Sequence, residues 1–162
     1  MFLAFDPNSY GRVADSCNSI GYKPLFSLVP DATNSLTSID SMDGAIVYSG
    51  VFPWFDTSHP SIAEMHRAMA LYTPRAEADQ TAGDDWVAAQ MFERAARGHL
   101  SATPTSQDVL TGLWSIKNDT IGGLTYPITF VQGRNAEVQH CWWVAVIHDH
   151  KFTSPDRNVR CV

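Results

Sequence analysis

The chain has 162 residues, a length typical of one domain, and its 44% hydrophobic content is enough to build a core. Charged residues make up 17% and the formal net charge is −6, so the sequence lacks the basic stripe that nucleic-acid binding requires. A membrane-spanning helix is excluded, because no window approaches about 18 consecutive apolar residues.

A strand–helix–strand unit is predicted at the N-terminal end. The apolar run Phe2–Phe5 is typical of a parallel strand that is buried on both faces. Asp6 followed by Pro7 predicts a helix start, because aspartate accepts hydrogen bonds from free backbone N–H groups and proline fits the first turn. Apolar residues at helical spacing continue to Gly21, and Phe26–Val29 forms the second strand. The three elements make a βαβ unit with a right-handed crossover.

A third parallel strand is expected at Ala45–Tyr48, after residues 31–43, which are read as a loop with at most one helical turn. The next segment, residues 49–55, combines glycine and proline with aromatic rings, among them Phe52 and Trp54. Such a segment predicts a chain crossing or the wall of a cleft, because the backbone holds the rings in fixed places. The alternative is an ordinary loop whose rings fold into the core.

The carboxyl ends of parallel strands line the ligand crevice in α/β sheets. The strand ends expected here carry aromatic rings or carboxylates, namely Phe5, Asp6, Asp31, Phe52 and Trp54. They predict a wall that binds a small ligand. In a purely structural interpretation, Asp6 caps the following helix and Asp31 belongs to an Asx turn.

Helices dominate the middle of the chain. Apolar periodicity predicts one helix over Ser61–Tyr72, ended by Pro74, and another over Ala82–Arg97. A third helix is expected at Thr105–Ile116, whose first residue forms a capping box with Asp108.

Two late strands are expected at Tyr126–Phe130 and Cys141–Ile147. The second is the most apolar segment of the chain, which places it inside the sheet. The polar tail that follows residue 152 is expected to be frayed.

Candidate catalytic and metal-binding residues are few. His148 and His150 flank Asp149, and alternation along a strand would put both imidazoles on one face, but no third ligand has partner spacing. A solvated hairpin end is therefore the preferred interpretation. Asp84 and Asp85 are adjacent on a helix and point apart, so they are read as acids that favour the helix N-terminus. The sequence contains no recognisable nucleophile motif, and it predicts no enzyme, no cofactor and no metal site.

The chain has three cysteines, Cys17, Cys141 and Cys161, and none belongs to a C-x-x-C pair, so a structural zinc site is not expected. Their number fits buried thiols, or one disulfide with a spare cysteine.

The order of these parts resembles the periplasmic solute-binding proteins for branched-chain amino acids (Leu/Ile/Val type), the type I substrate-binding components of ABC transporters. The stretches that carry the resemblance are Phe2–Ser9, Arg12–Ala14, Cys17, Gly21–Pro24, Asp43–Trp54, Leu124–Phe130 and Cys141–Val144. The likeness covers residues 1–152, and it rests on the order and spacing of these stretches, since no single motif is diagnostic.

Members of this family are longer and have two α/β lobes, so the resemblance implies the C-terminal half of a type I periplasmic binding fold, built around a three-layer βαβ parallel sheet. Residues 1–52 are expected in lobe two and residues 53–135 in the part that returns to lobe one. Residues 136–152 would form the final crossing strand to lobe two, and residues 153–162 a polar tail. The signal peptide and most of lobe one would be missing.

The resemblance implies a component of an ABC uptake system that holds a branched-chain amino acid or related solute between the lobes and closes for a membrane permease. Its location would be periplasmic or extracytoplasmic, free or lipoprotein-anchored, and its other partner would be the missing N-terminal half. Phe5 and Asp6 match a strand end that contacts ligand. Asp31 matches an acid that meets the ligand's α-ammonium group, although the family has the longer glutamate there. An oxidising compartment would allow Cys17 and Cys141 to form a disulfide.

Two other functions are kept as alternatives. The first is a ligand-sensing domain of the same fold from a receptor or regulator. The second is a small α/β enzyme that uses Asp31 or His148, for which no catalytic constellation is found. A half fold would leave strand edges and apolar faces uncovered, so the isolated chain is expected to be marginally stable, to dimerise or to aggregate.

Overall fold

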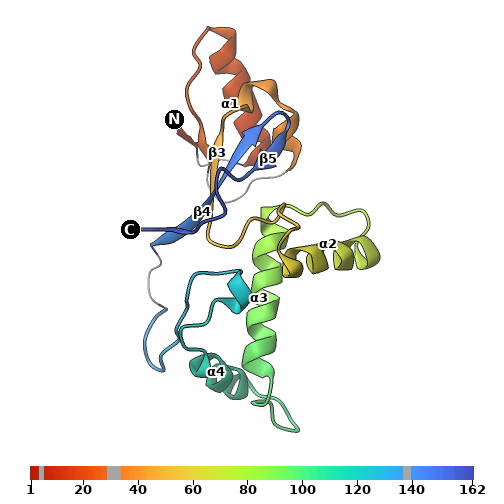
Figure 1. The fold of residues 1–162 in the computed structure, drawn as a ribbon, viewed down its shortest axis with the longest axis vertical. Helices are drawn as coiled ribbons and strands as arrows, with labels where there is room; N and C mark the ends of the chain where they lie inside the picture. Colours follow the sequence, from red (N-terminus) through yellow and green to blue (C-terminus); the bar gives the residue numbers. More distant parts are fainter. Residues whose placement is uncertain (4–5, 29–33, 137–139) are drawn as a thin grey trace.

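The computed structural model describes residues 1–3, 6–28, 34–136 and 140–162. The chain forms an elongated molecule with two parts (Figure 1). The sheet body consists of the strands and one α-helix, and the helical body contains the other three α-helices. None of the helices in the described ranges is long and apolar enough to cross a membrane.

The sheet body places its main strands in chain order. They are β1 (Phe2–Leu3), β2 (Ser27–Leu28), β3 (Ile46–Ser49), β4 (Cys141–His148) and β5 (Lys151–Thr153). The parallel pairing predicted for the first three strands is confirmed. The sheet as a whole is mixed, because β4 runs antiparallel to β3, and β5 runs antiparallel to β4. The expectation that β4 lies inside the sheet is confirmed, and its Ala145 lies opposite Val47 with both side chains buried.

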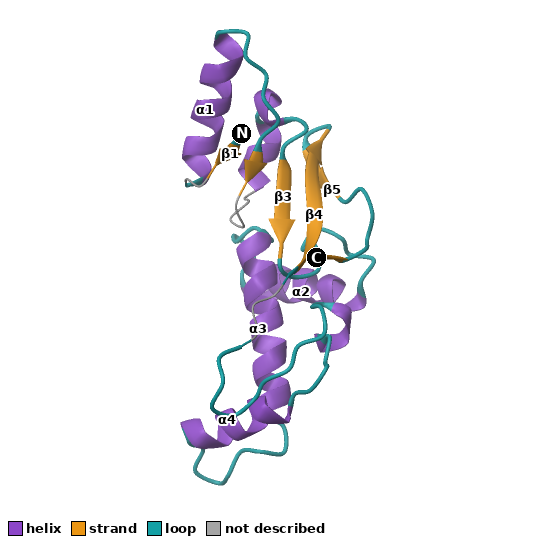
Figure 2. Cartoon of the chain, turned by 90° about the vertical axis from the view of Figure 1, so that its left-hand side faces the viewer, coloured by secondary structure: helices purple, strands orange, loops and turns teal. Residues whose placement is uncertain are grey.

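Helix α1 (Pro7–Ser19) packs on the sheet body beside the parallel strands (Figure 2). It begins where the Asp6 side chain caps the first turn, as predicted, and the chain turns away at Gly21, whose φ of 77° favours glycine. Tyr10 and Ala14 are buried in the core. The cap and the apolar face together explain why this segment forms a helix.

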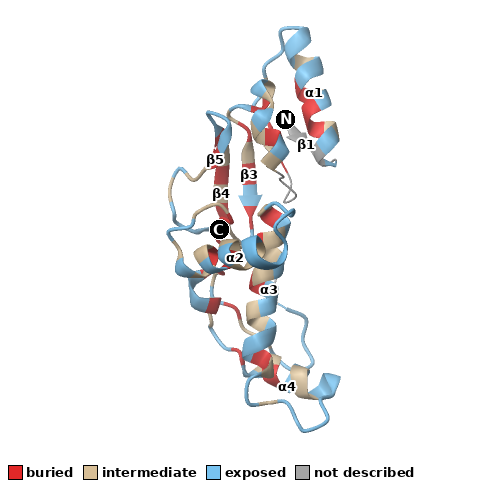
Figure 3. Ribbon diagram, turned by 90° about the vertical axis from the view of Figure 1, so that its right-hand side faces the viewer, coloured by how far each residue is buried: buried red, intermediate tan, exposed pale blue. Residues whose placement is uncertain are grey.

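Two short 3-10 helices occupy most of the polar segment that was expected to be mainly loop. They are η1 (Asn34–Ser38) and η2 (Asp40–Met42), and they bury Leu36 and Met42. Both contact α1, and η1 also contacts β5. Figure 3 shows the resulting band of buried residues along the strands and the inner side of α1.

The helical body contains α2 (Pro60–Tyr72), α3 (Gln80–Ala96) and α4 (Ser106–Ser115), which start and end within a residue or two of their predicted bounds. The predicted capping box is confirmed, since Thr105 and Asp108 exchange side-chain and backbone hydrogen bonds. α3 runs along the long axis of the molecule, with α2 near its start and α4 near its end (Figure 2).

Two stretches of chain connect the bodies. Residues 50–59, the first crossing, lead from β3 to α2, and the second crossing, of which residues 129–136 and 140 are described, precedes β4.

The strand predicted over Tyr126–Phe130 is wrong. These residues, all of them described, make a single antiparallel bridge, in which Ile128 and Asp119 exchange backbone hydrogen bonds of 2.9 and 3.1 Å. Burial of Leu124 and Ile128 explains the apolar pattern without a longer ladder.

The predicted disulfide between Cys17 and Cys141 is also wrong. Cys141 is bonded to Cys161, with Cα atoms 4.1 Å apart, and Cys17 on α1 is a free cysteine. The pairing forms because the chain reverses at the β4–β5 hairpin and returns along β4, where β6 (Arg160–Cys161) pairs antiparallel with the first residues of that strand. The expectation of a frayed tail therefore fails at these residues.

Candidate ligand-binding junction

The predicted ligand-binding residues at the first two strand ends are described only in part. Phe5 and Asp31 lie outside the described residues. Asp6 is exposed, and its carboxylate accepts hydrogen bonds from the backbone N–H groups of Asn8 at 3.1 Å and Ser9 at 3.3 Å. The Ser9 hydroxyl, which donates to Asp6 at 2.6 Å, is the main cause that lowers the pKa of this carboxyl. Asp6 thus caps α1 as an ionised group.

Phe52 lies in the first crossing and is buried. Its ring centroid is 4.8 Å from that of His59, which caps α2, and 6.2 Å from that of Trp143 on β4. The backbone N–H of Phe52 donates to Leu124 O at 2.8 Å. The ring therefore joins the start of the helical body to the sheet.

Trp54, two residues further along, is 1% exposed. Its ring centroid lies 5.2 Å from that of Phe55 and 4.9 Å from that of Phe152 on β5. His66 of α2 contacts Trp54 O at 2.8 Å, and a Cβ added at Gly83 of α3 would lie 3.0 Å from Trp54 Cβ. Of the two interpretations that the sequence left open for these rings, the structure favours burial in the core of the crossing.

The N-terminus of α3 lies against the sheet body on the side where the parallel strands end. Gln80, a buried residue of α3, donates from Nε2 to Tyr48 O at 3.3 Å. Asn34, the first residue of η1, donates from Nδ2 to Ala78 O at 3.1 Å. These contacts bring a helix N-terminus to the edge of the sheet where a ligand is expected.

An aromatic pair that the sequence analysis did not identify lies at the same edge. Tyr48 on β3 and Trp142 on β4 meet edge to face, with centroids 6.3 Å apart and planes at 82°. Tyr48 is 37% exposed and Trp142 is half-buried, so both keep surface that a ligand could contact. Their positions near strand ends could have indicated a role in ligand binding, but the sequence does not give the β3–β4 register that brings the two rings together.

Asp84, a half-buried carboxylate, lies in the second turn of α3. Burial raises the pKa of Asp84 to about 6, and the negative charges of Asp85 and Asp79 act in the same direction. Asp79 itself caps α3 by accepting the Ala82 N–H at 2.9 Å. The start of α3 therefore carries three acidic side chains, one of which changes charge near pH 6.

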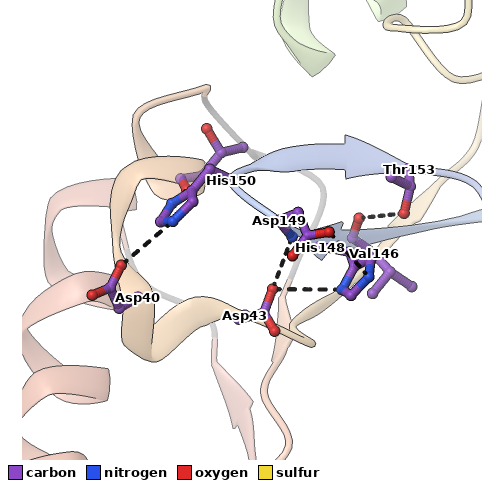
Figure 4. Close-up of polar contacts among 8 residues, drawn as sticks. Asp40, Asp43, Val146, His148, Asp149, His150 and Thr153 are labelled. Carbon is purple, nitrogen blue, oxygen red and sulfur yellow. Dashed lines mark hydrogen bonds and ion pairs between the residues drawn. The ribbon is translucent and has the colours of Figure 1, made fainter.

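The hairpin end that carries the two histidines lies at the opposite edge of the sheet, because β4 runs antiparallel to β3. His148 places Nδ1 3.8 Å from Asp43 and Nε2 3.6 Å from Asp149, and His150 places Nε2 3.7 Å from Asp40 (Figure 4). All five side chains are exposed, as expected for a solvated hairpin end. Within the described ranges, no group of three His, Cys, Asp or Glu side chains could hold a metal ion.

No family model matches the chain, and no curated protein matches its sequence. Solved structures match it over nearly its full length. A possible leucine/isoleucine/valine-binding protein from Rhodopirellula baltica superposes on 96% of this chain with a TM-score of 0.78 and 17% identity. A fatty acid ABC transporter substrate-binding protein from Thermomonospora curvata covers 99% with a TM-score of 0.80 and 15% identity. A branched chain amino acid ABC transporter protein from Thermus thermophilus, with bound valine, covers 99% with a TM-score of 0.74 and 10% identity.

The chain has part of the type I periplasmic binding fold. It spans 42%, 43% and 45% of the three matched chains, so it corresponds to less than half of each. The fold that the resemblance implies is thereby confirmed.

Proposed function

We propose that the chain is part of a solute-binding protein of an ABC uptake system, and that the junction between its two bodies forms one wall of the ligand cleft. The observation that carries the proposal is the contact of the α3 N-terminus with the ends of β3 and η1, next to the first crossing. Ligands of α/β sheets bind beyond the carboxyl ends of the parallel strands. In a molecule of two connected bodies, that position allows closure around a solute.

Each predicted residue receives a role in this proposal. Phe5, Asp6 and Asp31 are proposed to contact the solute, and Asp31 to pair with its ammonium group. Phe52 and Trp54 are buried, so they hold the first crossing in place behind the cleft wall.

Tyr48 and Trp142 supply the aromatic surface of the cleft wall, because both combine a strand-end position with exposed ring surface. Rings of this kind bury an apolar ligand group, while few polar groups fix its orientation. The proposed solute is a branched-chain amino acid or a related small molecule with an apolar group. The names of the matched proteins, which refer to leucine, isoleucine, valine, branched-chain amino acids and fatty acids, support that class.

The whole protein is proposed to act outside the cytoplasm and to deliver its solute to a membrane permease. Most of its lobe one is proposed to correspond to the portion of the matched structures that this chain does not span.

Isothermal titration of the chain with L-leucine, L-valine and octanoate, with L-lysine as the control solute, tests the proposal. We expect at least one apolar solute to bind, and Asp31→Asn and Tyr48→Ala each to weaken binding about tenfold, or about 1.4 kcal/mol. Tyr22→Ala, at an exposed ring beyond the end of α1, is the matched control and should bind normally. The proposal fails if no solute binds at millimolar concentration, or if Tyr22→Ala and Tyr48→Ala weaken binding equally.

A further inference from the structure

The C-terminal segment, residues 154–162, runs back from the β4–β5 hairpin toward the junction (Figure 1). Its first residue, Ser154, donates from Oγ to Val144 O at 3.1 Å, which keeps it beside β4. At its other end the backbone N–H of Val162 donates to His140 O at 3.0 Å. The segment is therefore held beside β4 at both of its ends.

One attachment is covalent and lies where the second crossing enters the sheet. Cys141 is the first residue of β4, and its disulfide partner Cys161 lies opposite it in the β4–β6 pair. Trp142, which forms part of the proposed cleft wall, is paired with Arg160 in the same ladder. The bond therefore fixes the end of the segment to the first residue of β4, directly after the second crossing and beside the aromatic pair.

The other attachment is ionic and lies in the first crossing. Arg157 places Nε 2.8 Å from Asp56 Oδ2, and the Asp56 side chain is only 12% exposed. The second oxygen of Asp56 accepts hydrogen bonds from the backbone N–H of Ser58 at 3.1 Å and from its hydroxyl at 2.6 Å. Removing the guanidinium would leave a largely buried carboxylate without its cation, which is unfavourable. The same short segment thus binds both crossings.

We propose that residues 154–162 form a strap that ties the two crossings together and limits the rotation of the sheet body against the helical body. The inference rests on the proposed function, in which these bodies close around a solute, and it adds a control on that motion. A segment that is attached to both crossings opposes the movement of one crossing relative to the other.

The disulfide makes the strap sensitive to dithiol reductants. A dithiol breaks the Cys141–Cys161 bond by thiol–disulfide exchange, in which both cysteines become thiols and the reductant is oxidised to its own disulfide. The two electrons and two protons come from the dithiol. The ion pair between Arg157 and Asp56 is not broken by this reaction.

Hydrogen–deuterium exchange of the full chain without solute, read by mass spectrometry, tests the strap. In the double variant Cys141→Ser/Cys161→Ser, we expect amides of residues 50–59 and 140–144 to exchange about tenfold faster, while those of α1 and α4 change less than about twofold. Arg157→Gln, which keeps the disulfide, should accelerate residues 50–59 in the same way. Arg97→Gln removes an exposed ion pair within α3 and is the matched control, with no expected change at the crossings.

Dithiothreitol should reproduce the double variant in the unsubstituted chain and should have no effect on the double variant itself. Unchanged exchange at both crossings overturns the strap, and so does an equal acceleration throughout the chain, which would show general destabilisation. The measurement needs no ligand, so a failure of solute binding and a failure of the strap are separate results.

Discussion

At the scale of single residues, Asp84 shows how one half-buried carboxylate makes stability depend on pH. Its pKa is about 6 in the folded protein and 3.8 as the usual value, because burial and the charges of Asp85 and Asp79 oppose ionisation. The folded state therefore binds this proton more tightly than the unfolded chain does. The stability that protonation contributes is fully present below pH 3.8 and is lost as the pH rises through about 6.

Asp84→Asn removes that pH-dependent cost. The full pKa shift corresponds to about 3 kcal/mol, and partial exposure to water reduces the expected gain in unfolding free energy to about 1 kcal/mol at pH 8. Near pH 4, where the aspartate is protonated when folded, the two proteins should differ little. Urea unfolding at both pH values, followed by tryptophan fluorescence, measures the difference.

The control for this prediction is Glu64→Gln, which changes an exposed carboxylate of α2 that does not contribute to the shift of Asp84. A gain for Asp84→Asn that is equal at both pH values would show that the carboxylate charge is not the cause.

Residue roles could be predicted from the sequence where they depend on neighbours along the chain. Asp6 caps its helix as predicted, because both donors lie within the next few residues. The Tyr48–Trp142 pair could not be predicted, because it depends on the register of strands far apart in the sequence. Burial of Trp54 could be stated only as one of two options for the same reason, since its partner Phe152 comes from the end of the chain.

At the scale of elements, the helices were predictable and the late strands only in part. Each helix carries a capping side chain at its start and a periodic apolar face, and both signals are local. Tyr126–Phe130 has the apolar content of a strand, but Pro127 lacks an N–H and the segment folds back on residues 116–119. The disulfide was mispredicted because its formation depends on the return of the tail along β4.

The contact of α3 with α4 depends on the absence of a side chain at Gly112. A Cβ there would lie 1.7 Å from Ala95 O, and backbone atoms of a packed helix cannot move aside as a flexible side chain can. Gly112→Ala should therefore separate the helices and lower the unfolding free energy by about 2–3 kcal/mol, despite the better helix propensity of alanine. Thermal melts followed by circular dichroism measure the loss.

Gly50→Ala is the matched control, since a Cβ at this position meets no atom within 4 Å. A Gly112→Ala protein that melts with the unsubstituted chain would contradict the close approach of α3 and α4.

At the scale of the whole molecule, the order and spacing of the elements predicted the fold, although the three matched structures share at most 17% identity with the chain. The order of strands and helices is retained, and it brings the parallel strand ends to the junction. The surface, however, is larger than that of a compact protein. The molecule exposes 9581 Å² at 17.9 kDa, and a compact monomer of this mass exposes about 8,000 Å².

The excess surface includes large apolar side chains on both bodies. They include Ile20, Tyr22, Leu25, Leu71, Tyr72 and Phe92, each more than half exposed. The excess of about 1,600 Å² equals the area that a standard protein–protein interface buries. An interface with a partner would bury apolar surface of this extent. In a solution that contains only this chain, the partner is a second copy of the chain.

We therefore expect the isolated chain to self-associate reversibly. Sedimentation velocity over about 1–100 μM should show an elongated monomer at the lowest concentration and a growing dimer fraction above it, as mass action requires. The free energy of unfolding should rise with concentration for the same reason. A monomer that sediments as a compact sphere would contradict the elongated arrangement of the two bodies. A chain that stays monomeric at every concentration would contradict the association expected from its uncovered apolar surface.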